Sequence, residues 1–205
     1  MSLKQTYNAL TGDFNLVKAD EYNPAMYQVG RYFATVDTQN RITGLGSSNG
    51  ATLPSATNAT FSLFEVKLGV TISEILVQLS SQESGKFGRI AIAKPAADGS
   101  VGVIVHETAE FSVATGGPVT ITENVTLPKG FYYFIFVTDS TTAVLNTWLN
   151  GALPLSYPTP GLGAVCMGTF AHTFTDPIPD NPTGQTLGST STGTISATFR
   201  ISALL

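Results

Sequence analysis

Apolar and polar residues alternate along much of the chain after residue 60, and this two-residue period is typical of β-strands. In residues 70–81 the apolar positions keep the period, with one slip near Ser73 and Glu74. The closing segment shows the same pattern, with apolar positions at Ile195, Ala197, Phe199 and Ile201. We therefore predict that both segments are strands that bury one face.

The segment from Phe131 to Val137 breaks this alternation, because every residue in it is apolar or aromatic. A strand with one wet face would alternate, so this strand needs cover on both faces. We expect residues 131, 133, 135 and 137 to face one way and residues 132, 134 and 136 to face the other. The expected cover is the segment 150–193, which is rich in Pro, Gly and Thr and also carries Leu155, Tyr157, Val165, Met167, Phe170 and Phe174.

Turn residues separate the predicted strands, for example Asp98–Gly99 and the stretch "TGGP" at residues 115–118. Short strands divided by Gly, Pro and Asp turns are typical of an antiparallel sandwich. We predict an all-β fold with little helix, in which residues 51–205 form an antiparallel β-sandwich with a long loop at residues 150–193.

Residues 1–50 differ from the rest of the chain, because their apolar pieces are short and are divided by Asn, Asp, Gly and Pro. Strands are predicted only around Phe14–Val17 and Arg31–Val36, and neither is long enough to build a core. We interpret this region as an extended N-terminal attachment arm followed by a linker.

Composition narrows the function classes. Charged residues make up 12% of the chain and the net charge is −4, without a cluster of Lys or Arg. We therefore expect no nucleic-acid binding through the phosphate backbone. No apolar run approaches the ~20 residues that span a bilayer, so membrane insertion is not expected. The first residues lack the apolar segment of a secretory signal, which predicts a soluble protein made in a cytoplasm.

Candidates for metal binding or nucleophilic chemistry are few: His106, His172 and Cys166. A metal site needs several ligands at close spacing, and no HExxH or similar motif occurs, so we expect no metal ion and no cofactor. A single cysteine between apolar neighbours is expected to be a buried, inert thiol. Each histidine is expected to have a structural role.

An enzymatic hypothesis rests on the loop that holds His172, Asp176 and Asp180. A Ser–His–Asp triad needs a serine near His172 and Asp176, and cleavage of a glycosidic bond needs a pair of carboxylates such as Asp176 and Asp180. The sequence contains no G-x-S-x-G motif and does not select either geometry. A proline-restricted loop with solvated or capping aspartates is the favoured reading. We expect no enzyme; a depolymerase or an esterase is the alternative.

Trp148 is the best candidate for a sugar-binding platform, because an exposed indole stacks on the apolar face of a sugar, and Tyr157 is a candidate to join it. A core or interface anchor is the favoured alternative for Trp148. Apolar residues also cluster there, at Trp148, Leu149, Leu153 and Leu155. This cluster predicts self-association, with a trimer as the first choice.

Three stretches carry a resemblance to a known family: "GRIAIAKPAADGSVG" (88–102), "VTITENVTLPKGFYYFIFVTDS" (119–140) and the closing "TFRISALL" (198–205). With the long Pro/Gly loop before the last stretch, their succession resembles the jelly-roll modules of tailed-phage structural proteins. Leu127, Pro128, Gly130 and Tyr132 match the element that opens an aromatic strand in those modules. The arm segment "YNALTGDFNLV" also resembles the openings of phage virion proteins.

The resemblance implies a jelly-roll-like sandwich in a non-enzymatic virion structural protein, such as a tail fibre, a tail appendage or a head decoration. It implies docking on other virion structural proteins, a homo-oligomer and a location in the virion. The alternative is a glycan-binding module that recognises a host surface. The family carries no catalytic motif to transfer.

Overall fold

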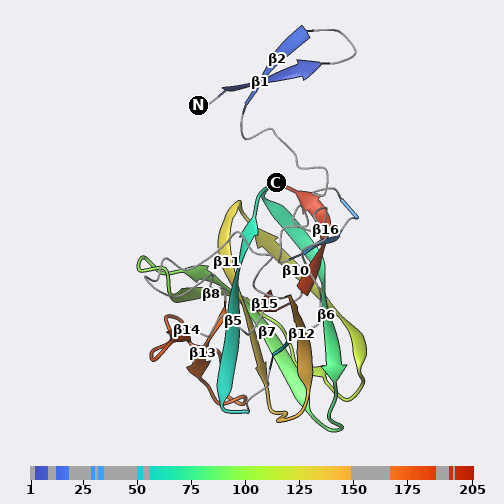
Figure 1. The fold of residues 1–205 in the computed structure, drawn as a ribbon, viewed down its shortest axis with the longest axis vertical. Coiled ribbons are helices and arrows are strands. Elements are labelled where there is room, and N and C mark those ends of the chain that lie inside the picture. The colour runs from blue at the N-terminus through green and yellow to red at the C-terminus, as the bar shows by residue number, and fades with distance from the viewer. Residues whose placement is uncertain are drawn as a thin grey trace.

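The computed structural model describes residues 3–8, 13–18, 29–30, 32–34, 50–52, 56–148, 167–187, 194–195 and 197–205. The regular structure of these residues is entirely β-strand, which confirms the predicted all-β class (Figure 1). Accordingly, the described ranges hold no helix with the length and apolar character needed to span a membrane.

The strands form one two-stranded sheet and two seven-stranded sheets, and every pairing is antiparallel. The two-stranded sheet pairs β1 (Leu3–Asn8) with β2 (Asp13–Lys18). Sheet I contains β3 (Tyr32–Ala34), β4 (Gly50–Thr52), β6 (Val70–Ser81), β10 (Gly117–Leu127), β12 (Val144–Trp148), β15 (Thr194–Ile195) and β16 (Ala197–Leu204). Sheet II contains β5 (Asn58–Val66), β7 (Phe87–Pro95), β8 (Val101–Glu107), β9 (Phe111–Ser112), β11 (Gly130–Thr138), β13 (Met167–Ala171) and β14 (Thr186–Leu187).

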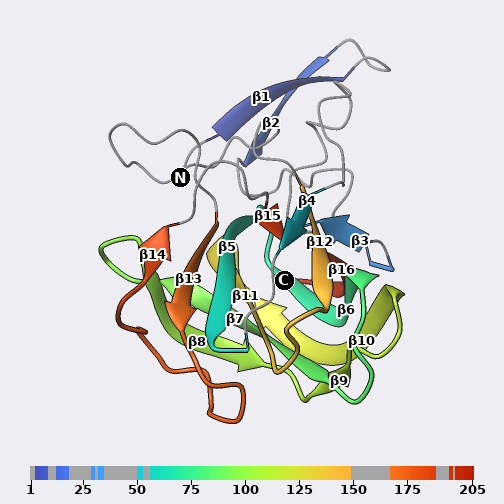
Figure 2. The ribbon, with the colours of Figure 1, turned by 60° about the horizontal axis from the view of Figure 1, so that its bottom comes forward.

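Sheets I and II pack face to face as a sandwich (Figure 2). Phe199 of β16 in sheet I meets Phe64 of β5 and Phe134 of β11 in sheet II, with ring centroids 5.3 and 6.1 Å apart. The alternating residues predicted for the closing strand, Ile195, Ala197, Phe199 and Ile201, are all fully buried in this core. The two-residue period thus marks the inward face correctly.

Strand β11 is the inner strand that the apolar segment 131–137 predicted, because it lies between β5 and β7. Its residues Tyr132, Phe134 and Phe136 belong to the core between the sheets. Its residues Tyr133, Ile135 and Val137 lie on the outer face of sheet II, in a second core with Phe61, Phe170, Phe174 and Ile178. The described part of segment 150–193 therefore supplies the expected cover. Phe131 is the exception, since its side chain is 46% exposed.

The slip near Ser73 is a β-bulge. In the pairing of β6 with β16, Glu74 lies opposite Arg200 and Ile72 lies opposite Ile201, so Ser73 is an extra residue of β6. The pairing of β6 with β10 has its own register shift, between Thr122 and Val125. A bulge of this kind restores the inward face after the extra residue. The register change explains how Ile72 and Ile75, three positions apart, are both buried.

The strands predicted within the arm are present as β2 and β3. Strand β3 pairs with β16 at the edge of sheet I, and the backbone N–H of Gly30 donates to the carbonyl of Ile201 at 2.7 Å. Residues 32–34 are therefore part of the sandwich. Strands β1 and β2 pair with each other and with neither larger sheet. The division of the chain at residue 50 stays a prediction.

Candidate functional site

The segment between β13 and β14, residues 172–185, crosses the outer face of sheet II, and we call it the strap. Figure 2 shows it leaving β13 and returning to β14 beside β8. Phe174 and Ile178 of the strap are buried against β7 and β11 in the second core. The strap contains the residues on which an enzymatic reading depends.

Arg89 of β7 fastens the strap to the sheet. Its Nη1 donates to Oε1 of Glu107 at 2.5 Å, and its Nη2 donates to the backbone carbonyls of Phe174 and of Asp176, the latter at 2.6 Å. The guanidinium carbon also lies 5.0 Å from the centroid of the Phe174 ring. The Arg89 side chain is only 13% exposed, so these contacts lie largely out of water.

The end of the strap closes the outer edge of β8. The N–H of Ile104 donates to Oδ1 of Asp180 at 2.7 Å, and the N–H of Asn181 donates to the carbonyl of Gly102 at 3.0 Å. The side-chain amide of Gln185 exchanges hydrogen bonds with the backbone of Val101, at 2.8 and 3.0 Å. These contacts protect residues 101–104 of this edge strand from pairing with another chain.

His172 begins the strap and is buried, with 9% of its surface exposed. Its backbone N–H donates to the carbonyl of Thr57 at 2.9 Å, and its ring lies edge-on to Phe170. The Nε2 atom is buried and has no hydrogen-bond partner within the described residues. Burial lowers the pKa of His172, and the positive charge of Arg89 lowers this pKa further, so the ring is held neutral.

A hollow of about 450 Å³ opens beside His172. Its described lining comprises Thr57, Ala171, His172, Thr173, Asp176, Pro177 and Pro179. This lining holds neither serine nor cysteine, so these residues do not supply the nucleophile of a triad. The backbone carbonyl of Asp176 accepts from Arg89, and the side chain of Asp180 caps the N–H of Ile104 on β8. Nor do the described residues gather three potential metal ligands anywhere.

The neutral state of His172 predicts a loss of stability in acid. The unfolded chain takes up a proton near the ordinary pKa of about 6.5, whereas the folded chain resists protonation at His172. The free energy of unfolding should therefore fall as the pH drops from 6.5 through the lowered pKa. His172→Gln should remove this part of the pH dependence in thermal unfolding between pH 7.5 and 5. An equal loss of stability in acid for the wild type and the His172→Gln variant would contradict the prediction. His106→Gln is the control.

His106 lies at the end of β8 beside Glu107, as predicted. Its Nε2 lies 2.9 Å from Oε2 of Glu123, which belongs to the bulge of β10. Strand β8 belongs to sheet II and β10 to sheet I, so this contact joins the two sheets along one open side of the sandwich. A structural role for His106 stays a prediction.

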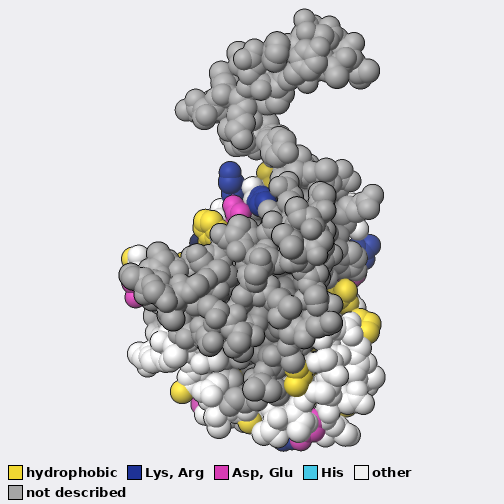
Figure 3. Space-filling model, viewed as in Figure 1, with side chains coloured by type: hydrophobic (Ala, Val, Ile, Leu, Met, Phe, Trp, Pro, Cys, Tyr) yellow, Lys and Arg dark blue, Asp and Glu magenta, His cyan; other side chains and the backbone are white. Residues whose placement is uncertain are grey.

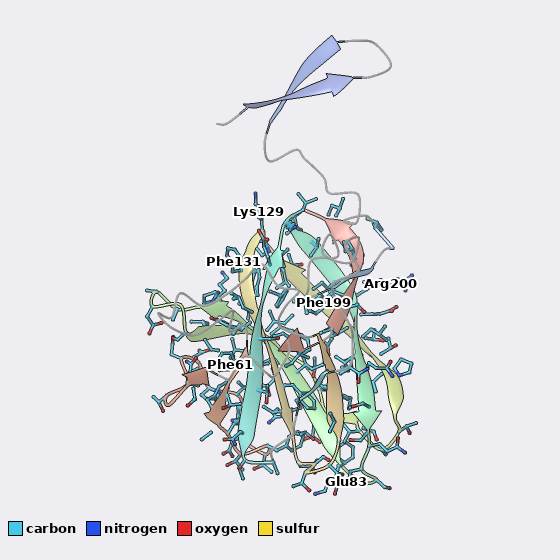
Figure 4. The ribbon with its side chains drawn as sticks, in the orientation of Figure 1. Phe61, Glu83, Lys129, Phe131, Phe199 and Arg200 are labelled. Carbon is cyan, nitrogen blue, oxygen red and sulfur yellow. The ribbon has the colours of Figure 1, made fainter. Side chains whose placement is uncertain are left out.

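The end of the sandwich that holds Glu83, called the far end, is tied together by polar contacts. Oε2 of Glu83 accepts hydrogen bonds from Oγ of Ser140 at 2.6 Å, from N–H of Thr141 at 3.1 Å and from Oγ1 of Thr142 at 3.0 Å. These donors, Ser140 above all, lower the pKa of Glu83. Figure 4 places Glu83 at the end of the sandwich opposite the β1–β2 hairpin.

The opposite end, called the arm end, lies nearest the hairpin and exposes apolar side chains. Figure 4 places Lys129 and Phe131 there, and Figure 1 places the C-terminus there. Val29, Phe131, Leu204 and Leu205 are exposed to 62%, 46%, 37% and 62%. Figure 3 shows apolar, basic and acidic side chains together at this end. The other exposed large apolar residues of the described chain are Phe87, Val103 and Val105.

Trp148 is the last residue of β12, and its backbone pairs with Thr194 of β15. Its side chain lies outside the part of the chain that the structure describes, as do Tyr157, Cys166 and the cluster at residues 149–155. A sugar platform at Trp148 and Tyr157, and self-association through this cluster, stay predictions.

The class of protein that the fold itself defines is an all-β antiparallel sandwich. No protein-family model and no curated protein matches the chain. Among solved structures, a chain from a structure of infectious bursal disease virus, Gx strain, is similar, with 13% identity and a TM-score of 0.29. The match covers 82% of this chain and 39% of that chain. A likeness at this level carries no argument about function.

Proposed function

We propose that the chain is a non-enzymatic structural protein of a virus particle, of the phage fibre, tail-appendage or head-decoration kind, which docks by its N-terminal arm and displays its sandwich. The observation that carries the proposal is the difference between the two ends. A hairpin that pairs with neither larger sheet lies beyond an end that exposes Phe131, Leu204 and Leu205. Polar contacts of Glu83 tie the far end, where Phe87 is also partly exposed. Exposed apolar patches mark surfaces that bind other molecules.

The sandwich suits display on a particle because both faces of sheet II are covered by packed side chains. One core lies between the sheets, and the strap covers the second core on the outer face of sheet II. The strap also occupies the edge of β8. A domain built in this way can stand in solution at the surface of a particle without pairing through that edge.

The test is a deletion of residues 1–18, which removes the hairpin and keeps β3. Particles of the encoding virus that lack the protein are incubated with purified wild-type or deleted chain, and bound copies are counted by gel densitometry. We expect the wild type to bind and the deletion to lose binding while keeping its unfolding midpoint. Wild-type chain that does not bind the particle, or deleted chain that binds at the normal copy number, would overturn the proposal.

A longer deletion, of residues 1–45, serves as a second arm of the test. It also removes β3 and the hydrogen bond from Gly30 to Ile201, so it should lower the stability of the sandwich as well as abolish docking. Comparing the two deletions separates loss of docking from loss of fold.

A host-glycan receptor is the second candidate function. The hollow beside His172 is lined by Thr57, Asp176 and two prolines, residue types that can bond sugar hydroxyls and contact an apolar sugar face. Glycan-array binding by the full chain, lost in Asp176→Asn, would favour this function.

We also propose that the protein forms a homo-oligomer, with a trimer as first choice. Light scattering on purified protein tests this proposal.

A further inference from the structure

The strap buries few of its own side chains. Of residues 172–180, only His172, Phe174 and Ile178 are buried, and the other six are exposed. In β11 beneath the strap, by contrast, every residue from 132 to 138 is buried. Segments that bury little apolar surface open locally at a lower free energy than the strands they cover. We therefore expect the strap to open before the sheet beneath it does.

His172 lies where the strap leaves this sheet. Strand β13 ends at Ala171, whose partner in β5 is Asn58, and the next N–H, that of His172, donates to the carbonyl of Thr57 at 2.9 Å. Beyond this hydrogen bond the pairing of β13 with β5 stops. A change in the state of the His172 ring therefore acts at the point where the strap begins to separate from sheet II.

The closed strap has no partner for a second proton on this ring. Nε2 of His172 is buried and has no hydrogen-bond partner among the described residues. A neutral imidazole carries one N–H, whereas the imidazolium cation carries a proton on both ring nitrogens. The cation would therefore bury an Nε2–H group without an acceptor, and an unpaired charge away from water is costly.

Charged groups from three elements act on the ring: Arg89 of β7, Glu107 of β8 and Asp176 of the strap. Burial disfavours the cation most, and the positive charge of Arg89 disfavours it further, whereas the two carboxylates favour it. The carboxylate of Glu107 is occupied by Arg89 and, at 3.4 Å, by the N–H of Ile178. The balance lowers the pKa of His172, so the closed strap favours the neutral ring.

We propose that the strap is a cover released by acid: protonation of His172 opens residues 172–181 while the two sheets of the sandwich stay paired. Opening withdraws Asp180 from the N–H of Ile104, which makes the edge of β8 available to another chain. Opening also uncovers the apolar outer face of sheet II. The proposal goes beyond docking by the arm and does not depend on it.

Acid acts within one pH range. Once the strap is open, water surrounds the ring, which then takes up a proton near the ordinary pKa of about 6.5. Above this pH the ring is neutral in both states, and the opening equilibrium does not depend on it. As the pH falls from about 6.5 through the lowered pKa of the closed state, the open state binds more protons and its population rises. For a single proton, the rise between pH 7.5 and pH 5 is at most about thirtyfold.

Hydrogen exchange of the full chain between pH 7.5 and pH 5 tests the release. Protection factors, which are corrected for the intrinsic exchange rate at each pH, report the open population. The amides of Asp176, Asn181 and Ile104 form hydrogen bonds within the closed strap or between the strap and β8. In wild type their protection should fall by about threefold to thirtyfold, while residues 70–81 of sheet I keep theirs. His106→Gln is the control and should behave as wild type does.

Two variants remove the titrating ring. His172→Gln has no charge to gain, and His172→Phe keeps a ring beside Phe170. A variant whose strap is protected at pH 7.5 should keep this protection at pH 5. In wild type, NMR of the imidazole nitrogens should show His172 titrating in the pH range in which protection is lost. This second readout decides the question even if both variants open the strap at pH 7.5.

Three results would overturn the proposal. A wild-type fall below about threefold would show that acid does not open the strap. An equal fall in a closed variant, or titration of His172 outside the pH range of opening, would assign the opening to another group. Loss of protection in residues 70–81 together with the strap would show that acid unfolds the sandwich as a whole and releases no cover.

Discussion

Replacing Phe134 with alanine is expected to lower the free energy of unfolding by about 3–5 kcal/mol. Phe134 is fully buried between the two sheets, and its ring lies 6.1 Å from that of Phe199 on the opposite sheet. The variant loses the burial of the ring, leaves a cavity that a β-sandwich cannot close, and removes a contact between the sheets. Urea unfolding followed by circular dichroism measures the loss.

Phe131→Ala is the matched control, because Phe131 is the same residue type on the same strand and is 46% exposed. The Phe131→Ala variant should lose no more than about 0.5 kcal/mol of unfolding free energy, which is usual for surface substitutions. Similar losses for the two variants would mean that Phe131 is embedded as deeply as Phe134, contrary to the fold. Because Phe131→Ala should stay folded, it also reports on the arm end in the particle-binding assay.

The strands could be predicted because their pattern and their burial have one cause. In a sandwich, each residue of a strand faces either the core or the other side of its sheet. The alternation of Ile195, Ala197 and Phe199 therefore indicates which face is inward. The run at residues 131–137 could be interpreted in the same way, since two buried faces leave no polar position. Local sequence predicts which face of these strands is buried, but it does not mark where a strand leaves the core: Phe131, in the same apolar run, is 46% exposed.

The strap could not be predicted in the same way. Arg89 binds the carbonyls of Phe174 and Asp176, more than eighty residues further along the chain. Backbone carbonyls are present at every residue, so the sequence does not mark which ones an arginine will meet. The only signal was Arg89 directly before the apolar residues Ile90–Ala93 of β7, which indicates that something polar must face the arginine.

The geometry of the candidate residues could not be predicted either. His172, Asp176 and Asp180 lie close in the sequence, and the structure places His172 and Asp176 in the lining of one hollow, whereas Asp180 is not in its described lining. In the fold, the backbone of Asp176 is held by Arg89 and the side chain of Asp180 by the edge of β8. Spacing along a loop does not determine which way each side chain points, because hydrogen bonds to the neighbouring sheet select which atoms of the loop turn inward.

Arg89→Met is expected to lower the free energy of unfolding by about 3 kcal/mol, because it removes one partner from a largely buried ion pair. The Arg89 and Glu107 side chains are 13% and 23% exposed, so the carboxylate of Glu107 would lose its charged partner away from water. The carbonyls of Phe174 and Asp176 would also lose their donor. The strap should then detach, which limited proteolysis within residues 172–180 would detect before global unfolding.

Arg200→Met is the control, because Arg200 also pairs with a carboxylate, at 2.6 Å from Glu74, but its side chain is 45% exposed. Exposed pairs contribute about 0.2–1 kcal/mol, so this variant should lose far less stability and leave the strap uncut. Adding Glu107→Gln to Arg89→Met should restore part of the loss, since no unpaired charge would remain. Equal losses at Arg89 and Arg200, without cleavage of the strap, would show that Arg89 acts only as a surface ion pair and that Phe174 and Ile178 hold the strap unaided.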